Sequence, residues 1–386
     1  MPARLQFNRR ELAGAFGDIG TDLPLIISLL LATRLDPAGV FVAYGLLQIG
    51  TGVLYGLPMP VQPLKAMAVV VIAGQATGGQ LQLAGLMIGG IMLLLAGSGL
   101  LDRLQKLIPL VVVRGVQAGL GLNLARTALG LAGLEGRWGW AAAAVAVGLL
   151  VALREHRRVP GALIVIGAGV LWAAACRIDW STVGSGFGWA WPQPAHLPWD
   201  QWSIALTLLV LPQLPLSLSN SLIATQHTVR DFFPEKSLTL RAIGFTYGAM
   251  NLIVPLLGGI PVCHGCGGLA GYHALGARTG GAVVIYGSIY LLIGAFFSGA
   301  FREVVQAFPL PVLAAVLLVE AGALVLLLRD LGPSSTRLAL AAVVALLCVF
   351  APQGYLTGLV AGTVLYYALR RTPAGVDLKN AKPSPG

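Results

Sequence analysis

The stretch 258–281, GGIPVCHGCGGLAGYHALGARTGG, gathers thiol and imidazole side chains among many glycines. Cys263, His264 and Cys266 are zinc-ligand types, but on a helix the two cysteines share a face while His264 points about 100° away. The sequence offers no second Cys–His cluster to complete a tetrahedral set. We therefore expect no metal and no cofactor. The alternative is an anion site, because glycines such as Gly265 let an oxyanion approach the backbone N–H groups of a helix start.

Two carboxylates interrupt the apolar segment near the N-terminus. Asp18 and Asp22 are four residues apart, which predicts that they share one helix face. Carboxylates inside apolar segments are costly and mark functional sites, so we interpret them as proton or cation coupling groups. Asp18 has a second interpretation, as a cap at a helix break beside Gly17. Thr21 is expected to donate a hydrogen bond to the anion.

A lysine follows an amide at the start of a second short segment, YGLPMPVQPLKAMAVV (55–70). Gln62 would offer neutral donors to the anion, and Pro63 lies beside it. Lys65 is expected to pair either with the oxyanion or with one of the aspartates. Both possibilities stay open at this point.

Polar side chains also interrupt the segment LPQLPLSLSNSLIAT (211–225). Gln213, Ser217 and Asn220 follow i, i+4, i+7 spacing and so predict one polar helix face. This face would form a third wall of the site, or it would hold neighbouring helices together.

His264, in the stretch 258–281, is expected either to donate a hydrogen bond to the anion or to gain and lose a proton.

The composition indicates which kind of structure holds these residues in place. Hydrophobic residues make up 56% of the 386, charged residues 10%, and the mean hydropathy is +0.81. Soluble domains carry about 25% charged residues, so the chain predicts many membrane spans in a lipid bilayer. The net charge of +10 fits basic cytoplasmic loops, and no nucleic-acid-binding motif accompanies it.

Apolar windows of about 20 residues predict the spans. Twelve are long: 12–32, 38–56, 81–101, 107–126, 138–154, 159–177, 201–226, 238–257, 282–301, 310–328, 335–350 and 352–369. Two short, Pro- or Gly-interrupted segments at 60–74 and 262–275 bring the total to about fourteen. With both termini cytoplasmic, roughly eighteen basic residues lie in inner loops and about five in outer loops.

The chain repeats itself weakly. GDIGTDLPLIISLLLAT (17–33) is similar to LVLPQLPLSLSNSLIAT (209–225), and each is followed by a short Pro-containing segment. Seven spans in each half would place the second copy inverted, and paired short segments of this kind indicate a transporter's binding site. We expect Pro60 and Pro261 to begin two half-helices in mid-membrane. Their unpaired N–H groups would then hold an anion.

Four motifs together resemble the molybdate transporter family, a branch related to SulP sulfate permeases and more distantly to uracil permease: GAFGDIGTDLPLI, GLPMPVQPLKAMAVVVIAG, LPQLPLSLSNSLIAT and GGIPVCHGCGGLAGYHALGARTGG. The resemblance implies an all-α fold of seven plus seven inverted spans, with half-helices at spans 3 and 10. It also implies a core domain that carries the site and moves against a gate domain like an elevator. The sequence ends soon after its last predicted span, without the STAS domain of typical sulfate permeases.

The implied division of the chain follows these spans. We expect a cytoplasmic N-terminus (1–10), core parts at 11–104 and 201–304, gate parts at 105–178 and 305–371, an outer linker (179–200) and a cytoplasmic tail (372–386). Arg114 and Glu320 would be gate charges that pair within the gate or at the domain boundary.

The function implied is transport of molybdate, with no enzymatic activity. Tungstate or sulfate would fit the same site, because any tetrahedral dianion suits it. A nucleobase carrier or an anion channel of the same fold is the alternative. Relatives suggest a homodimer, and the expected location is the bacterial inner membrane.

Overall fold

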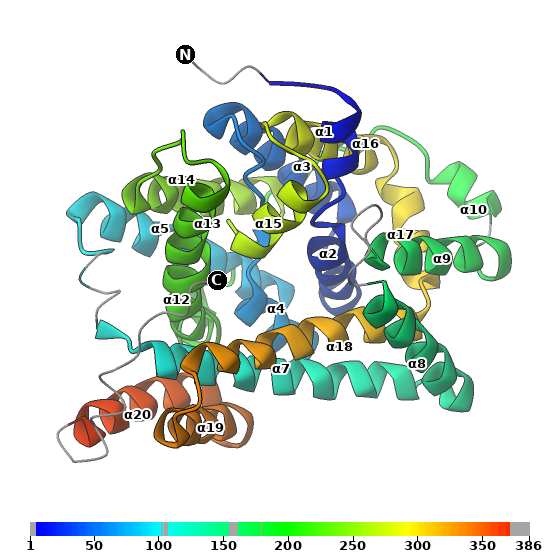
Figure 1. Ribbon diagram of the computed structural model, residues 1–386. Helices are drawn as coiled ribbons and strands as arrows, with labels where there is room; N and C mark the ends of the chain where they lie inside the picture. Colours follow the sequence, from blue (N-terminus) through cyan, green and yellow to red (C-terminus); the bar gives the residue numbers. More distant parts are fainter. Residues whose placement is uncertain (1–4, 102, 104–106, 154–160, 179, 371–386) are drawn as a thin grey trace.

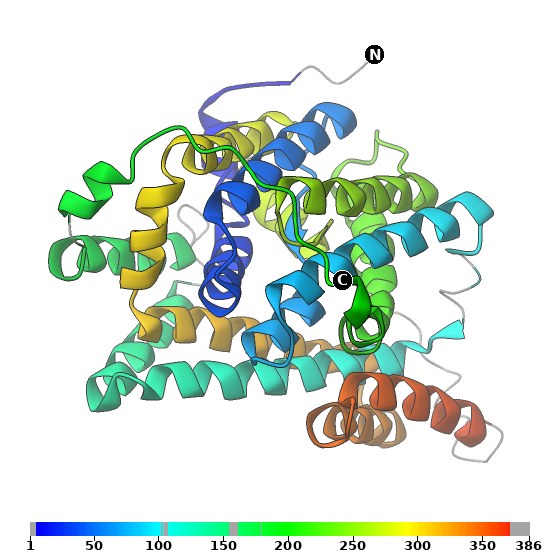
Figure 2. The same ribbon diagram turned by 180° about the vertical axis from the view of Figure 1, so that it is seen from behind.

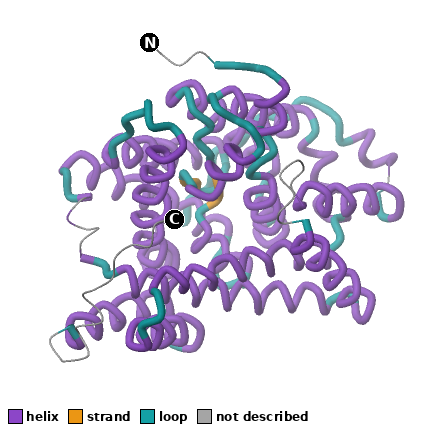
Figure 3. The backbone as a smooth tube through the Cα atoms, in the orientation of Figure 1, coloured by secondary structure: helices purple, strands orange, loops and turns teal. Residues whose placement is uncertain are grey.

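The structure, a computed structural model, describes residues 5–101, 103, 107–153, 161–178 and 180–370. Within these residues it is all-α apart from one pair of two-residue strands (Figure 3). The first part of the chain contains α1 (Arg9–Gly14), α2 (Ile19–Thr33), α3 (Pro37–Tyr55), β1 (Gln62–Pro63), α4 (Lys65–Ile72), α5 (Gly78–Ser98), α7 (Leu110–Gly133), α8 (Gly136–Ala152), α9 (Gly161–Cys176) and α10 (Trp180–Ser185). The predicted tail, 372–386, lies outside the described residues.

The second part begins with a long helical segment that includes short 3-10 and π turns. It consists of η1 (Trp199–Gln201), α11 (Trp202–Ile204), η2 (Ala205–Val210), α12 (Leu211–Leu216), η3 (Ser217–Ala224) and α13 (Thr225–Phe232). The remaining elements are α14 (Leu240–Ile253), η4 (Val254–Leu257), β2 (Val262–Cys263), α15 (Cys266–Ala274), α16 (Gly281–Phe296), α17 (Ser298–Ala307), α18 (Leu310–Leu326), η5 (Leu327–Leu331), α19 (Ser335–Phe350) and α20 (Gly354–Leu369).

Helix lengths agree with a multi-pass arrangement. In the described residues, five helices are by themselves long and apolar enough to cross a membrane: Pro37–Tyr55, Gly78–Ser98, Trp199–Phe232, Leu240–Leu257 and Leu310–Leu331. α16 and α17 count as a sixth if they form one span, which bends by 95° between them. Five apolar helices of 10–17 residues fall in other predicted windows.

The helices gather into two groups (Figures 1 and 2). One group contains α7, which packs against α18 and α19, together with α8 and α20. In the other group, α3 packs along α16 and α5 packs along α14. Glycines permit these close contacts, because a methyl group at Gly45 would come within 2.6 Å of the Leu291 nitrogen, and one at Gly248 within 2.9 Å of the Gly89 oxygen.

The long segment from Trp199 to Phe232 contains two π-helical stretches, η2 and η3, on either side of α12. Pro212 and Pro215 lie between them and supply no backbone N–H, so the α-helical hydrogen-bond pattern is interrupted there. Wider π turns accommodate such interruptions and often mark functional segments. The side chains of this segment therefore leave the regular i, i+4, i+7 register after Ser217.

The two short strands meet at the centre of the molecule (Figure 3). β1 and β2 pair antiparallel, with Gln62 opposite Cys263 and Pro63 opposite Val262. Asn251 of α14 holds β2 in place, since its side chain donates to the Val262 oxygen at 2.7 Å and accepts from the Val262 nitrogen at 2.9 Å.

These strands correct the predicted half-helix starts. The prediction that Pro60 and Pro261 begin the half-helices is wrong, because α4 begins at Lys65 and α15 at Cys266. The residues after each proline are extended, and the Leu64 nitrogen donates to the Pro261 oxygen at 3.1 Å. Backbone groups that would otherwise be unpaired in mid-membrane thus satisfy one another. α15 has nine residues and spans about 14 Å, less than the predicted half-helix.

Candidate functional site

The N-terminal ends of α4 and α15 face the same central region, because both helices emerge from the paired strands. Lys65 is the first residue of α4, so it follows directly on β1, the strand that pairs with Cys263 of β2. Aligned peptide dipoles make each helix start a site of partial positive charge. The structure therefore brings together two helix starts and a lysine, as an anion site requires.

The first turn of α15 is open. Its N-cap residue is Gly265, which has no side chain that could cap this turn. Gly267 is exposed, and a methyl group placed there would have no described atom within 4 Å. The first N–H groups of a helix have no partner within the helix. These N–H groups of α15 are therefore the backbone donors best placed for an anion.

The other two glycines of this turn make room for protein side chains. A methyl group at Gly265 would overlap the Gln62 side-chain oxygen, and one at Gly268 would overlap the carboxylate of Asp18. The expectation that Gly265 admits the oxyanion itself therefore needs correction, since the space beside it is filled by Gln62. Only Gly267, of these three glycines, faces open space.

Gln62 and Asp18 form a buried hydrogen-bonded pair behind this turn. The Gln62 Nε2 donates to Asp18 Oδ1 at 2.5 Å, and both residues are at most 2% exposed. Asp18 Oδ2 has no hydrogen-bond partner in the described part of the chain. Asp18 occupies the N-cap position of α2 but makes no side-chain cap hydrogen bond. Its position at the helix break was anticipated, and its side chain is directed to Gln62 instead of to the α2 backbone.

The Glu320 carboxylate joins Lys65 and Thr21. Lys65 Nζ lies 3.1 Å from Glu320 Oε2, and Thr21 Oγ1 donates to Glu320 Oε1 at 3.1 Å. The structure thus pairs Lys65 with Glu320 of α18, instead of with Asp18 or Asp22. Thr21 and Lys65 therefore lie close together, and both contact the same carboxylate. Glu320 of α18 thereby links α2 to α4.

Gln213 caps the start of α4. Its Oε1 accepts hydrogen bonds from the backbone nitrogens of Ala66 at 2.9 Å and Met67 at 3.3 Å. Its Nε2 donates to Ser217 Oγ at 3.1 Å, which in turn lies 2.7 Å from the Tyr247 hydroxyl. The expectation of two equally open helix starts is therefore wrong: protein already satisfies α4, whereas α15 is open.

This cap gives a first prediction. Replacing Gln213 by leucine should lower the free energy of unfolding by about 1–3 kcal/mol, because the Ala66 and Met67 N–H groups would be buried without acceptors. Thermal unfolding of the purified protein measures the effect. Ser219→Ala is the control on the same segment, since among the described residues Ser219 bonds only to the nearby Leu216 oxygen, at 3.4 Å. Equal unfolding temperatures for the two variants would contradict the capping role.

The remaining polar residues of the long segment and of β2 lie nearby. Cys266 Sγ donates to Asn220 Oδ1 at 3.2 Å, which connects α15 to η3. Cys263 is buried in β2 opposite Gln62, and Pro63 is buried in β1. Asn220 and Cys266 are partly exposed, so these two border the open space at the first turn of α15.

His264 connects the two strand regions. Its Nδ1 donates to the Pro60 oxygen at 3.0 Å, so its Nε2 accepts from Thr246 Oγ1 at 2.9 Å. This fully buried neutral ring has no N–H left for an anion. The predicted contact with the anion therefore receives no support, and the side chain holds the backbone instead. In the described residues, no group of three or more His, Cys, Asp and Glu side chains is arranged to hold a metal ion.

Asp22 faces a different neighbour from Asp18. It is fully buried, and its Oδ1 accepts a hydrogen bond from the Tyr286 hydroxyl at 2.8 Å. Tyr286 in turn lies 2.6 Å from the Tyr290 hydroxyl. Asp22 Oδ2 is without a partner among the described residues. Asp22 therefore has different hydrogen-bond partners from Asp18, although it lies one turn away on α2.

The comparisons with known proteins decide the family. A family described as "Molybdate transporter of MFS superfamily" matches residues 10–124 and 205–324. The chain belongs to the molybdate transporter family. It is 32% identical to Molybdate transporter 2 of Arabidopsis thaliana, over 83% of this chain and 79% of that protein. It is 31% identical to Molybdate transporter 1 of the same plant, over 97% of this chain and 90% of that protein.

A solved structure confirms the all-α membrane fold. The transmembrane domain of BicA, a cyanobacterium bicarbonate transporter, superposes with a TM-score of 0.68 at 16% identity, over 92% of this chain and 100% of that chain. This member of the molybdate transporter family is therefore an all-α, multi-pass membrane protein of a transporter fold, and not an enzyme. The recognition made from the four motifs is confirmed.

Two features of this family member were missed from the sequence. Glu320 was assigned from the sequence to a domain boundary and not to the predicted site. A lone carboxylate in the apolar window 310–328 is nevertheless an indication of a functional residue. Arg114 Nε is a buried donor without a partner among the described residues, while its terminal nitrogen pairs with Asp330.

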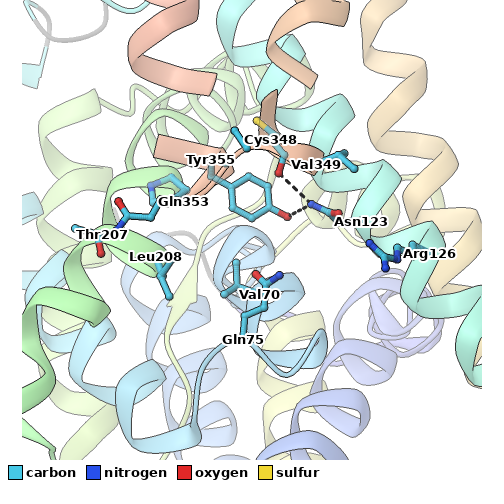
Figure 4. Close-up of a pocket in the computed structure, with 13 residues that line it drawn as sticks. Val70, Gln75, Asn123, Arg126, Thr207, Leu208, Cys348, Val349, Gln353 and Tyr355 are labelled. Atoms are coloured by element: carbon cyan, nitrogen blue, oxygen red, sulfur yellow. Dashed lines mark hydrogen bonds between the residues drawn. The ribbon is translucent and has the colours of Figure 1, made fainter. Parts of the chain in front are cut away.

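A separate cavity of about 310 Å³ lies at the other end of α4 (Figure 4). Val70 and Gln75 line it, together with Arg126 of α7 and Tyr355 of α20. Asn123 Nδ2 donates to the Tyr355 hydroxyl at 2.7 Å across it. All of the predicted site residues are described, and none of them lines this cavity.

Proposed function

We propose that the chain transports molybdate and holds the dianion at the open first turn of α15, beside Lys65 and Thr21. The observation that carries this proposal is the start of α15, where the N-cap residue Gly265 has no side chain and Gly267 is exposed, beside the strand pair from which Lys65 also emerges. Helix starts bind oxyanions through backbone N–H groups and the positive end of the dipole. The relatives named molybdate transporters supply the choice of anion.

Neutral donors suit a carrier better than a cluster of cations would, since bound substrate has to be released. Gln62 stands behind the open turn, and Asn220 and Cys266 border it. In this proposal Gln213, Ser217, Cys263, Pro63 and Gly265 shape the site without contacting the anion. Tungstate and sulfate are tetrahedral dianions too, so they are the alternative substrates.

Packing supports seven plus seven inverted spans. If α3 corresponds to α14 and α5 to α16, a two-fold axis exchanges the α3–α16 contact with the α14–α5 contact, and both contacts exist. The antiparallel pairing of β1 with β2 is also what such an axis produces. We propose the core at 11–104 and 201–304 and the gate at 105–178 and 305–371, moving relative to each other in an elevator mechanism.

The cavity of Figure 4 would be the outer approach to this site. Its lining includes Arg126 and several amides but no carboxylate, so it favours anions. With the N-terminus cytoplasmic, the C-terminal end of α4 faces outward. A homodimer in a bacterial inner membrane remains part of the proposal.

Uptake into liposomes tests the function. The purified full chain is reconstituted, and entry of molybdate is followed with tungstate, sulfate and uracil as competitors. Saturable molybdate uptake, inhibited by tungstate and little by uracil, is expected. A preference for sulfate would be consistent with the anion site but would contradict the assignment of molybdate as substrate. Uptake of uracil alone would exclude an anion carrier. Flux that does not saturate would favour a channel.

Coupling to protons is proposed for Asp22 and Asp18, because compensation of a dianion's charge needs an ionisable group. Asp22→Asn is expected to retain molybdate binding, since the hydrogen bond of Asp22 is to Tyr286 of α16 and not to α15. Stimulation of uptake by an inward proton gradient should fall about tenfold or more, which corresponds to at least about 1.4 kcal/mol of coupling. Asp231→Asn, on an exposed site, is the control, and unchanged stimulation in Asp22→Asn would contradict the role.

A further inference from the structure

Glu320 occupies donors that the site would offer to its substrate. One carboxylate oxygen lies 3.1 Å from Lys65 Nζ, and the other accepts from Thr21 Oγ1 at 3.1 Å. Thr21 and Lys65 belong to different elements, α2 and α4, so this pair of donors recognises a bidentate oxyanion. Hydrogen bonds of this kind to a charged acceptor are stronger than neutral ones.

We propose that Glu320 is a tethered substitute for the substrate. This inference rests on the proposed function and adds a competitor to it. Without substrate, the Glu320 carboxylate satisfies Lys65 and Thr21. A molybdate ion that reaches the site takes over both donors and displaces Glu320.

The exposure of the ion pair permits such an exchange. The side chains of Lys65 and Glu320 are 21% and 17% exposed, so neither is completely enclosed by protein. A partly exposed ion pair is of modest strength, because water screens it. A dianion that also binds the N–H groups of α15 would bind Lys65 more strongly than one carboxylate does.

The exchange links binding to the movement of the two helix groups. Glu320 lies on α18 in the proposed gate, and both of its partners, Thr21 of α2 and Lys65 of α4, lie in the proposed core (11–104). Its two contacts are therefore polar connections between gate and core. Displacement by substrate removes them, because a carboxylate and a dianion repel each other at the same donors. Substrate binding would thus release the core for movement.

Competition by Glu320 predicts the direction in which the Kd for molybdate changes when its charge is removed. When the binding-competent state is only a fraction of the empty protein, the apparent Kd is raised by the inverse of that fraction. If Glu320 occupies the donors for nine-tenths of the time, its removal should lower the Kd about tenfold. Glu320→Gln keeps the shape of the side chain and removes its charge.

Calorimetry with sodium molybdate on the purified full chain tests the inference. Glu320→Gln is expected to bind molybdate about tenfold more tightly than the wild type. Asp330→Asn is the matched control, because it removes a carboxylate that pairs with Arg114 and does not contact Lys65. Its Kd should stay within about twofold of the wild type.

The outcomes separate the two proposals. If the wild type binds molybdate and Glu320→Gln binds it with an unchanged or higher Kd, the role of Glu320 as a substitute for the substrate is overturned. The proposed transport function would still stand. Absence of molybdate binding in every variant would overturn both. If Glu320→Gln does not fold, the wild-type complex with tungstate decides: Lys65 should contact tungstate and lie apart from Glu320. A retained Lys65–Glu320 pair in that complex would overturn the inference.

Discussion

Replacing Lys65 by methionine should weaken molybdate binding by roughly 2–5 kcal/mol, which is about 30-fold or more in Kd. Lys65 is the cation assigned to the proposed site, because it begins α4 and pairs with Glu320 3.1 Å away. Methionine keeps the length and apolar stem of the side chain, so the change isolates the charge. Calorimetric titration of the purified protein with molybdate gives the Kd.

Two control variants make this result specific. Lys236→Met removes the charge of another lysine, whose Nζ bonds to the Tyr55 oxygen at 3.4 Å, and should leave the Kd unchanged. Lys65→Met also leaves Glu320 without its cation, which can lower stability on its own account. Combining Lys65→Met with Glu320→Gln should restore stability without restoring binding. A wild-type Kd in Lys65→Met would exclude Lys65 from the site.

Replacing Gly271 by alanine should destabilise the fold by about 3 kcal/mol or more. The added methyl group would overlap the backbone oxygen of Gly17, where the break before α2 contacts α15. Backbone cannot rotate away as a side-chain end can, so α15 would have to move away from α2. The unfolding temperature should fall, and uptake should fall with it.

Gly267→Ala is the matched control on the same helix. Both substitutions gain about 1 kcal/mol of helix propensity, but a methyl group at Gly267 meets open space. Stability should therefore be retained. If the anion binds this turn, the same methyl group should weaken molybdate binding several-fold. Equal unfolding temperatures for Gly271→Ala and Gly267→Ala would contradict the packing of α15 against the α2 break.

The spans could be predicted because hydropathy is a local property of the sequence. The apolar windows near 38–56 and 81–101 correspond to α3 and α5. The starts of the two half-helices could not be predicted in this way, because proline is compatible both with a helix start and with an extended segment. The deciding interaction is the pairing of Gln62 with Cys263, two hundred residues away, and no local pattern reports it.

The site could be predicted only in part, for a related reason. Residue types identified Thr21, Lys65, Gln62 and Cys266, which the structure places around one region. The partner of each polar group depends on tertiary contacts. Gln213 caps α4 because the long segment passes beside that helix start, and spacing alone made it a wall of the site. His264 likewise bonds to Pro60, far away in the chain.

Binding of tungstate tests the location of the anion most directly, since tungsten can be located by its anomalous scattering in crystals of the full chain. The account predicts one strong peak at the first turn of α15, within hydrogen-bonding distance of the Gly267 region and of Lys65. A peak only in the cavity beside Arg126, or only at the Gln213-capped start of α4, would contradict it.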